Sequence, residues 1–354
     1  MSETQSSSAG AGEIQFSYGG QAVIEGVLMR GAHNMAVAVR NPEGQIVVHE
    51  QALNKTLYRG RIARTPFVRG VIGLWDALVL GTRALMWAAD VAIGEDEDLN
   101  FNGPIGWATL AISLLIGVGF FFLLPTFTAT GIGNLLGITQ ASGEGLGDFL
   151  GYQPLPIGGA ATLINLIEAV VQLGILIAYI WLIGRVKDVR RLFQYHGAEH
   201  KTINAYEAGD ELTPETIIKY PIEHPRCGTA FLLDVVFISV IVFSLLGRPP
   251  ILLLILSRII LIPVIAGIAY EFLRFMAQHS DNPIVAFTIK PNLALQHLTT
   301  NEPDLDICEV AIVAFKRVLV SEGLLEDSEA IIPPAKPEAA AYPPENKPEP
   351  LPNN

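Results

Sequence analysis

Four long apolar segments constrain this chain more than any other feature of its sequence. They run from about residue 105 to 124, 163 to 183, 229 to 246 and 250 to 269. At 1.5 Å per helical residue, each is about long enough to cross the roughly 30 Å hydrocarbon core of a bilayer. Hydrophobic residues make up 50% of the chain and charged residues only 16%, unlike a typical soluble domain. The sequence therefore predicts an α-helical polytopic membrane protein with about four transmembrane helices.

Basic residues predict how these spans are oriented. Arg185, Lys187, Arg190 and Arg191 follow the second span, whereas residues 125–157 contain no Lys or Arg. Lys and Arg concentrate on the cytoplasmic side of membrane proteins. We therefore expect a multi-pass protein of the cytoplasmic membrane, with both termini cytosolic and an exterior loop between the first two spans. Arg248, in the short link between spans three and four, is then an exterior exception.

A fifth apolar stretch, residues 71–93, carries charges that a spanning helix would have to bury. Asp76, Arg83 and Asp90 lie one or two helical turns apart, and each would cost about 2.5 to 3.5 kcal/mol near the bilayer centre. The stretch is expected to be a helix at the inner interface or packed against the spans, with a re-entrant segment as the alternative.

The remaining segments predict a small α+β cytosolic domain built from the N-terminal region, residues 185–228 and the C-terminal region. Residues 35–40 and 45–49 have the apolar character of strands and flank an Asn-Pro-Glu-Gly turn, a pattern that is typical of a hairpin. Residues 304–319 begin with acidic residues and end with basic residues, a polarity that the helix dipole favours, so we expect a helix there.

The expected order of segments follows from these assignments. It is a disordered lead (1–17), a cytosolic β-containing module (18–70), an interfacial or buried helix (71–104), spans one and two with the exterior loop (105–184), a cytosolic segment (185–228), spans three and four (229–274), a cytosolic C-terminal region (275–325) and a disordered tail (326–354).

The most conspicuous chemistry is a pair of histidines in the cytosolic segment. In His196-Gly-Ala-Glu199-His200 the imidazoles lie one helical turn apart, so both can bind one metal ion while Glu199 acts as a general base. This is the inverted zincin spacing. The alternatives are a polar network that packs the cytosolic domain, or a surface helix.

A zinc site needs at least one more protein ligand. His224 and Cys227 are the first choices, because their segment returns to the same membrane surface just before span three. The alternative is that this segment only forms the turn into the span. Glu207, Asp281 and Glu271 are weaker candidates.

Other polar residues fall within the spans or in the glycine-rich N-terminal run. Glu168, Asp234 and Arg258 should face protein or water, and Arg258 is expected to pair with Glu168 or Asp234; a substrate or ion pathway is the alternative. Glu25 and Arg30 could pair with each other or face the histidines. The run between residues 19 and 31 fits no nucleotide-binding motif.

The chain resembles the YqhQ-like family of bacterial membrane proteins, a group of unknown function. The resemblance is carried by four runs: GQAVIEGVLMRG at 20–31, HGAEHKT at 196–202, HPRCGT at 224–229 and LQHLTT at 295–300. Members of this family are described as predicted metal-dependent enzymes, so the resemblance implies a metal site without implying a reaction.

Three hypotheses follow from the sequence. The first is a metal-dependent hydrolase at the cytosolic membrane face, with Zn²⁺ held by His196, His200 and either His224 or Cys227, and with Glu199 as the catalytic base. The second is a non-enzymatic membrane scaffold or regulator with a structural histidine network. The third, a transporter, is disfavoured by the short outer loops. Membrane lipid is the expected partner, and the net charge of −12 argues against nucleic acid.

Overall fold

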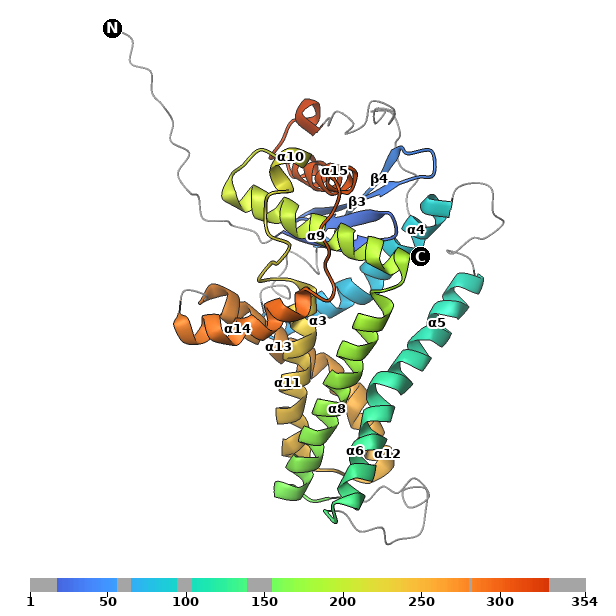
Figure 1. Cartoon of the computed structure of the whole chain (residues 1–354), viewed down its shortest axis with the longest axis vertical. Coiled ribbons are helices and arrows are strands. Elements are labelled where there is room, and N and C mark those ends of the chain that lie inside the picture. Colours follow the sequence, from blue (N-terminus) through green and yellow to red (C-terminus); the bar gives the residue numbers. More distant parts are fainter. Residues whose placement is uncertain (1–17, 56–64, 94–103, 139–154, 280–281, 331–354) are drawn as a thin grey trace.

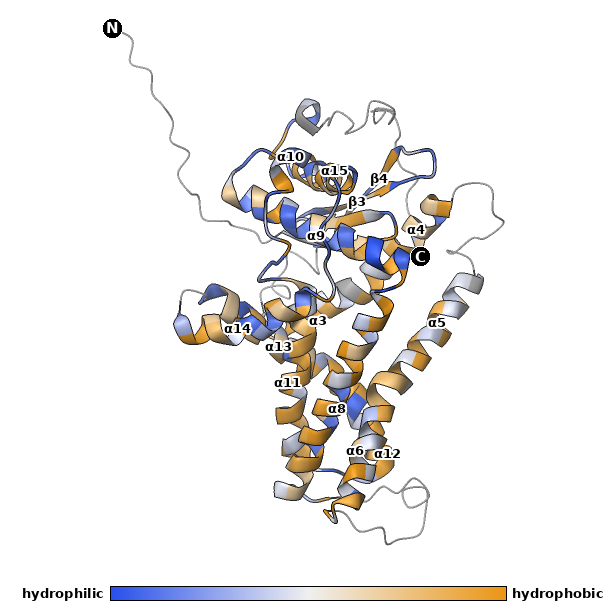
Figure 2. Cartoon of the chain, in the orientation of Figure 1, coloured by the Kyte–Doolittle hydropathy of each residue, from blue (hydrophilic) through white to orange (hydrophobic). Residues whose placement is uncertain are grey.

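The computed structural model of the chain describes residues 18–55, 65–93, 104–138, 155–279 and 282–330. These residues form an α+β domain at one end and a bundle of long helices at the other (Figure 1). Polar residues concentrate in the α+β domain, while the bundle is apolar over most of its length (Figure 2). The predicted lead (1–17) and most of the predicted tail lie outside the described residues.

The α+β domain is built on a four-stranded antiparallel sheet with its strands in chain order. The strands are β1 (Gly19–Val23), β2 (Gly26–Arg30), β3 (Asn34–Arg40) and β4 (Ile46–Ala52). The predicted hairpin is confirmed as β3 and β4, paired from Arg40 opposite Ile46 to Asn34 opposite Ala52. Gly44 adopts a φ of 83°, which favours glycine in the turn.

Both faces of this sheet are buried. Because side chains alternate between the two faces along each strand, neighbouring residues pack into two different cores. Val27, Met29, Ala36 and Ala38 pack against a core shared with α9 (Lys187–Ala208), α10 (Pro214–Ile217) and α15 (Leu305–Ser321). Val23, Leu28, Met35, Val37 and Val39 pack against α4 (Gly81–Ile93). The predicted C-terminal helix is confirmed as α15, which is buried over most of its length. A short 3-10 helix, η3 (Asp327–Ala330), ends the described chain.

The bundle supplies the long apolar helices. It contains α5 (Pro104–Val118), η2 (Gly119–Leu123), α6 (Leu124–Leu135), α8 (Gly159–Ile183), α11 (Gly228–Leu246), α12 (Ile251–Ile260) and α13 (Ile262–Gln278). Among the described residues, three continuous helices are long and apolar enough to cross a membrane: 68–93, 106–135 and 159–183. Helices α12 and α13, bent by 46°, would make a fourth if they count as one span.

Two boundaries of the predicted spans are corrected. The first span continues past Pro125 to Leu135, because proline is tolerated in the first turn of α6 and the helix does not end there. The first 11 residues of the predicted exterior loop, 125–135, are therefore helical. The fourth predicted span is not one straight helix, since it bends between Ile260 and Ile262.

The charged stretch before the bundle joins the two parts of the molecule. Its first helix, α3 (Val68–Trp75), packs against α13, where a Cβ at Gly70 would lie 2.9 Å from the Gly267 Cα. A π-helical turn, η1 (Asp76–Leu80), connects α3 to α4, which covers the sheet. Length and composition would allow 68–93 to span a bilayer, but its second half is packed in the core of the α+β domain.

A buried charge cluster holds the bundle together near the α11–α12 link. Glu168 on α8 accepts from Arg248 Nη1 at 2.7 Å and lies 2.9 Å from Arg258 Nη2. The predicted pair of Arg258 with Glu168 is confirmed, while Asp234 instead accepts from Asn292 Nδ2 at 3.1 Å. Arg248 is only 1% exposed. It was expected in an exterior link, but backbone pairing of that link with Leu155 turns its side chain into the bundle.

Candidate metal centre

Helix α9 places two histidines side by side at the boundary between the α+β domain and the bundle. The His196 and His200 ring centroids are 4.5 Å apart, as expected for residues one turn apart on a helix. The helix ends at Gly209, whose φ of 80° is the left-handed conformation common after the last helical turn. The expected presentation of both imidazoles on one face is therefore present.

Cys227 completes a group of three potential ligands. It is the N-cap of α11, where its Sγ accepts from the Thr229 backbone N–H at 3.3 Å, and the same Sγ lies 3.3 Å from His196 Nε2. One ligand atom from each of His196, His200 and Cys227 lies within 4.8 Å of the others. Ligands about 2.0 to 2.3 Å from a tetrahedral zinc ion are separated by roughly 3.3 to 3.8 Å, so little movement would bring these atoms onto one ion.

Backbone carbonyls orient both imidazoles. His196 Nδ1 lies 2.8 Å from the Thr299 carbonyl oxygen, and His200 Nδ1 lies 2.5 Å from that of Ile222. A carbonyl only accepts hydrogen bonds, so each Nδ1 carries the proton and each Nε2 keeps its lone pair. Hydrogen bonding of the second ring nitrogen to a carbonyl is typical of metal-binding histidines. The donor set and its orientation fit a zinc ion.

The end of α14 (Pro283–Gln296) and the residues just after it support the three-residue group. The Gln296 side chain accepts from the His224 backbone N–H and donates to the His224 carbonyl, both at 2.9 Å. This double hydrogen bond fixes the loop that carries Cys227. Together with Thr299, it makes the end of α14 part of the site. Sequence reasoning missed this role, although the LQHLTT run was one of the four that carried the family resemblance.

Gly197 lets the same segment close over α9. A Cβ at this position would lie 2.2 Å from the Asn301 carbonyl oxygen, so no larger residue fits without movement. The close approach explains why a poor helix former stands between two histidines.

We predict that Gly197→Ala destabilises the protein, although alanine is the better helix former by about 1 kcal/mol. The clash with Asn301 should lower the free energy of unfolding by about 1 to 3 kcal/mol. Thermal unfolding in detergent would measure this. Gly174→Ala is the matched control, since Gly174 is also helical and a Cβ there meets nothing within 4 Å. Equal stability of both variants would contradict the close-approach explanation.

Glu199 faces the sheet rather than the three ligand atoms. It is buried against β1, where it accepts from the Gly20 backbone N–H and where a Cβ at Gly20 would lie 3.1 Å from its side chain. Burial raises the pKa of Glu199 to about 7, and this rise is opposed by nearby His196 and by the Gly20 hydrogen bond. A carboxylate with a pKa near 7 is suited to accepting a proton.

The other sequence candidates lie outside the three-residue group. The ring of His224 lies 5.7 Å from that of His200, but its Nε2 points to Glu207, 3.8 Å from Oε2. Burial lowers the pKa of His224, and Glu207 partly opposes this. Glu207 also pairs with Arg226. Glu271 pairs with Arg69 at the start of α3, and Asp281 lies outside the described residues.

The N-terminal run folds back along α9. Glu25, between β1 and β2, pairs with Arg191 on α9 and accepts from the Tyr195 hydroxyl at 3.2 Å. Its φ of 52° is uncommon for a residue other than glycine. Glu25 therefore clamps β1 onto the turn of α9 just before His196, which holds Gly20 against Glu199.

Comparison with known proteins agrees with the resemblance in the sequence. A family model described as "Protein of unknown function (DUF1385)" matches residues 65–321. The chain is 32% identical to the uncharacterised protein YqhQ of Bacillus subtilis (strain 168) over 321 residues, covering 88% of this chain and 95% of that one. No solved structure matches the chain significantly. With a model match across most of its length and this relative, the chain belongs to the DUF1385 family of YqhQ-like proteins, whose function is unknown.

Proposed function

We propose that this protein is a membrane metalloprotein whose Zn²⁺ is held by His196, His200 and Cys227, and that it acts as a metal-dependent hydrolase at the cytosolic membrane face. The observation that carries the proposal is the convergence of the three ligand atoms within 4.8 Å, with both imidazoles oriented by backbone carbonyls. Three protein ligands leave a fourth position open, which is the usual composition of a catalytic zinc site.

Glu199 is the proposed general base. A bound zinc ion would supply Lewis acidity and lower the pKa of a coordinated water. The carboxylate lies on the same helix turn as His200 and within electrostatic range of His196, so it is near the proposed ion without being one of its ligands. Its side chain faces Gly20 in this structure and would have to turn toward the ion, where a pKa of about 7 would suit it to take a proton from an attacking water near neutral pH.

The membrane placement is also a proposal, supported by the faces of the helices. Side chains such as Leu115, Ile116 and Val170 are more than 60% exposed along helices that are apolar all round, which suits contact with lipid. At the C-terminal end of α8, the Arg185 guanidinium lies 3.3 Å from the centre of the Trp181 ring. Tryptophan and arginine gather at membrane interfaces, and arginine on the cytoplasmic side. The α+β domain and the metal centre would then face the cytosol, as would both termini.

Glu199→Gln tests the hydrolase. Glutamine keeps the size of the side chain but cannot accept the proton, so zinc content should stay unchanged while hydrolysis falls about 10²- to 10⁴-fold. The measurement is turnover of a panel of fluorogenic esters, phosphoesters and peptides by purified zinc-loaded protein, with metal content determined on the same samples. Failure of fully metal-loaded wild type to turn over any member of the panel faster than Glu199→Gln would contradict the hydrolase.

A second candidate, a scaffold with a structural metal centre, is favoured by burial. His200 is 1% and Cys227 6% exposed, which leaves less access than most catalytic metals have. In that case Glu199→Gln would retain metal and would leave both turnover and cellular function as in wild type.

A further inference from the structure

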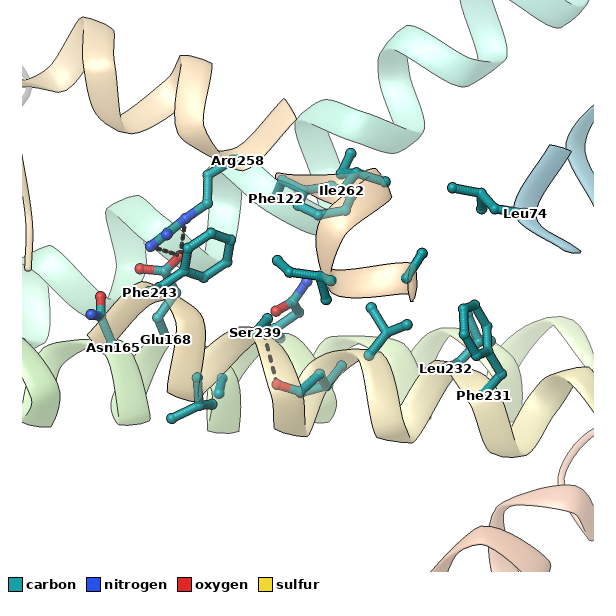
Figure 3. Close-up of a pocket in the computed structure, with 17 residues that line it drawn as sticks. Leu74, Phe122, Asn165, Glu168, Phe231, Leu232, Ser239, Phe243, Arg258 and Ile262 are labelled. Atoms are coloured by element: carbon teal, nitrogen blue, oxygen red, sulfur yellow. Dashed lines mark hydrogen bonds and ion pairs between the residues drawn. The ribbon is translucent and has the colours of Figure 1, made fainter. Parts of the chain in front are cut away.

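A cavity of about 200 Å³ lies inside the helical bundle, away from the metal centre (Figure 3). Most of its wall is apolar. One side of α11 contributes Phe231, Val235, Val236, Val240 and Phe243, and Ile262 and Ile265 also line the cavity. Asn165, Glu168 and Arg258 form a polar end, and the polar side chains of Gln172 and Ser239 also line the cavity. An apolar cavity with a few convergent polar groups is typical of a small-molecule binding site.

Asn165 leaves a buried donor unused at this polar end. Its side chain is 3% exposed, and its Oδ1 accepts from Arg248 Nη1 at 3.0 Å. A guanidinium only donates, so the oxygen must face Arg248 and the amide nitrogen must point elsewhere. That nitrogen, Nδ2, has no hydrogen-bond partner among the described residues. A buried donor left without an acceptor costs about 1 to 3 kcal/mol, so the site favours a ligand that brings an acceptor oxygen.

The charged groups beside Asn165 favour an anion. Arg258 is 5% exposed, lies over the Phe243 ring at 3.5 Å and lines the cavity. The carboxylate at this end, Glu168, already accepts hydrogen bonds from Thr126 Oγ1, Arg248 and Arg258. A ligand head group therefore meets an amide donor and a guanidinium, and a carboxylate whose charge is already countered by two arginines.

The size and shape of the cavity favour one chain. A cavity of roughly 150 Å³ holds a benzene molecule, so 200 Å³ suits a narrow ligand of moderate length rather than a lipid with two chains. The lining from Phe231 to Phe243 extends along about 18 Å of α11 at 1.5 Å per residue. This elongated apolar wall matches an extended hydrocarbon chain.

We propose that this cavity binds a medium-chain fatty acid, with its carboxylate accepting from Asn165 Nδ2 and facing Arg258, and its chain extending along α11 toward Phe231. The site is separate from the proposed hydrolase and does not depend on a bound metal.

Photolabelling of the full-length protein in nanodiscs of a zwitterionic lipid tests this proposal. The probe is decanoic acid carrying a diazirine and an alkyne, and labelled peptides are mapped by mass spectrometry. Labels are expected on α8 and α11 residues that line the cavity. Unlabelled decanoate should compete at least about tenfold better than decanol, since loss of one charge-assisted contact is worth about 1.4 kcal/mol or more.

Four variants sharpen the test. Ser239→Phe fills the cavity and should abolish the mapped labels, and Asn165→Asp replaces the donor with a carboxylate and should weaken decanoate competition about tenfold. Leu166→Phe, on the exposed face of α8, is the control and should label as wild type. The His196→Ala/His200→Ala variant should also label normally, so failure of the metal centre would not affect this result. Labels spread over lipid-facing residues and insensitive to Ser239→Phe, or equal competition by decanol, would overturn the proposal.

Discussion

Purified wild-type protein should contain about one zinc ion per chain, and the His196→Ala/His200→Ala variant should contain almost none. Loss of a hydrogen bond behind a metal ligand already costs about 10- to 100-fold in affinity, so loss of two of the three ligands themselves should exceed that. Metal analysis by mass spectrometry after extensive dialysis measures the content. Zinc binding adds to folding stability, so a chelator should lower the unfolding temperature of wild type and leave that of the double variant unchanged.

His33→Ala/His279→Ala is the matched control for this experiment. It also removes two histidines, but His33 lies after β2 and His279 at the end of α13, both with exposed side chains and outside the three-residue group. Metal content equal to wild type is expected. Wild type without stoichiometric zinc, or the same zinc content in both double variants, would contradict the metal centre.

Glu168→Ala should destabilise the bundle by about 3 to 5 kcal/mol, the cost of removing one partner from a buried ion pair. The carboxylate is shared by Arg248 and Arg258, which are 1% and 5% exposed and would lose their common counter-ion. Because the three residues come from α8, the α11–α12 link and α12, the loss should loosen the contact between these elements. Chemical unfolding in detergent, followed by tryptophan fluorescence, measures the effect.

Glu43→Ala provides the comparison, since Glu43 is an exposed glutamate in the turn between β3 and β4. Surface substitutions of this kind usually change stability by less than about 0.5 kcal/mol. If Glu168→Ala and Glu43→Ala unfolded at the same denaturant concentration, Glu168 would not hold the bundle together.

Much of the candidate site was visible in the sequence because it depends on local spacing. His196 and His200 share a helix face by periodicity alone, and Cys227 was suggested because its segment had to return to the same surface. The roles of Gln296 and Thr299 could not be predicted, because they depend on where α14 ends relative to the loop before α11. Only a chain folded in three dimensions brings residue 296 to residue 224.

The fold, too, has elements that the sequence predicted and elements that it did not. The hairpin of β3 and β4 and the C-terminal helix carried local turn and charge signals, and both are present. The strands β1 and β2 were not predicted, since glycines at 19, 20 and 26 are unusual within strands. The structure supplies the reason at Gly20, where a Cβ would lie 2.3 Å from the Leu28 carbonyl oxygen on β2 and 3.1 Å from the Glu199 side chain on α9.

Arg248 illustrates the limit of the charge rule for membrane topology. Counting basic residues treated it as an exterior exception, but its side chain is buried and pairs with a glutamate 80 residues earlier in the chain. A buried, paired arginine carries no information about sidedness, because its charge is countered within the protein. The orientation proposed here therefore depends on the cluster from Arg185 to Arg191.

X-ray absorption at the zinc edge tests the central claim most directly, because it reports the atoms around the ion. For zinc-loaded wild type we predict a shell of nitrogen or oxygen atoms at about 2.0 to 2.1 Å with one sulfur at about 2.3 Å. Cys227→Ser should lose the sulfur and retain the nitrogen scattering. A shell without sulfur in wild type, or a sulfur signal unchanged in Cys227→Ser, would contradict a centre formed by His196, His200 and Cys227.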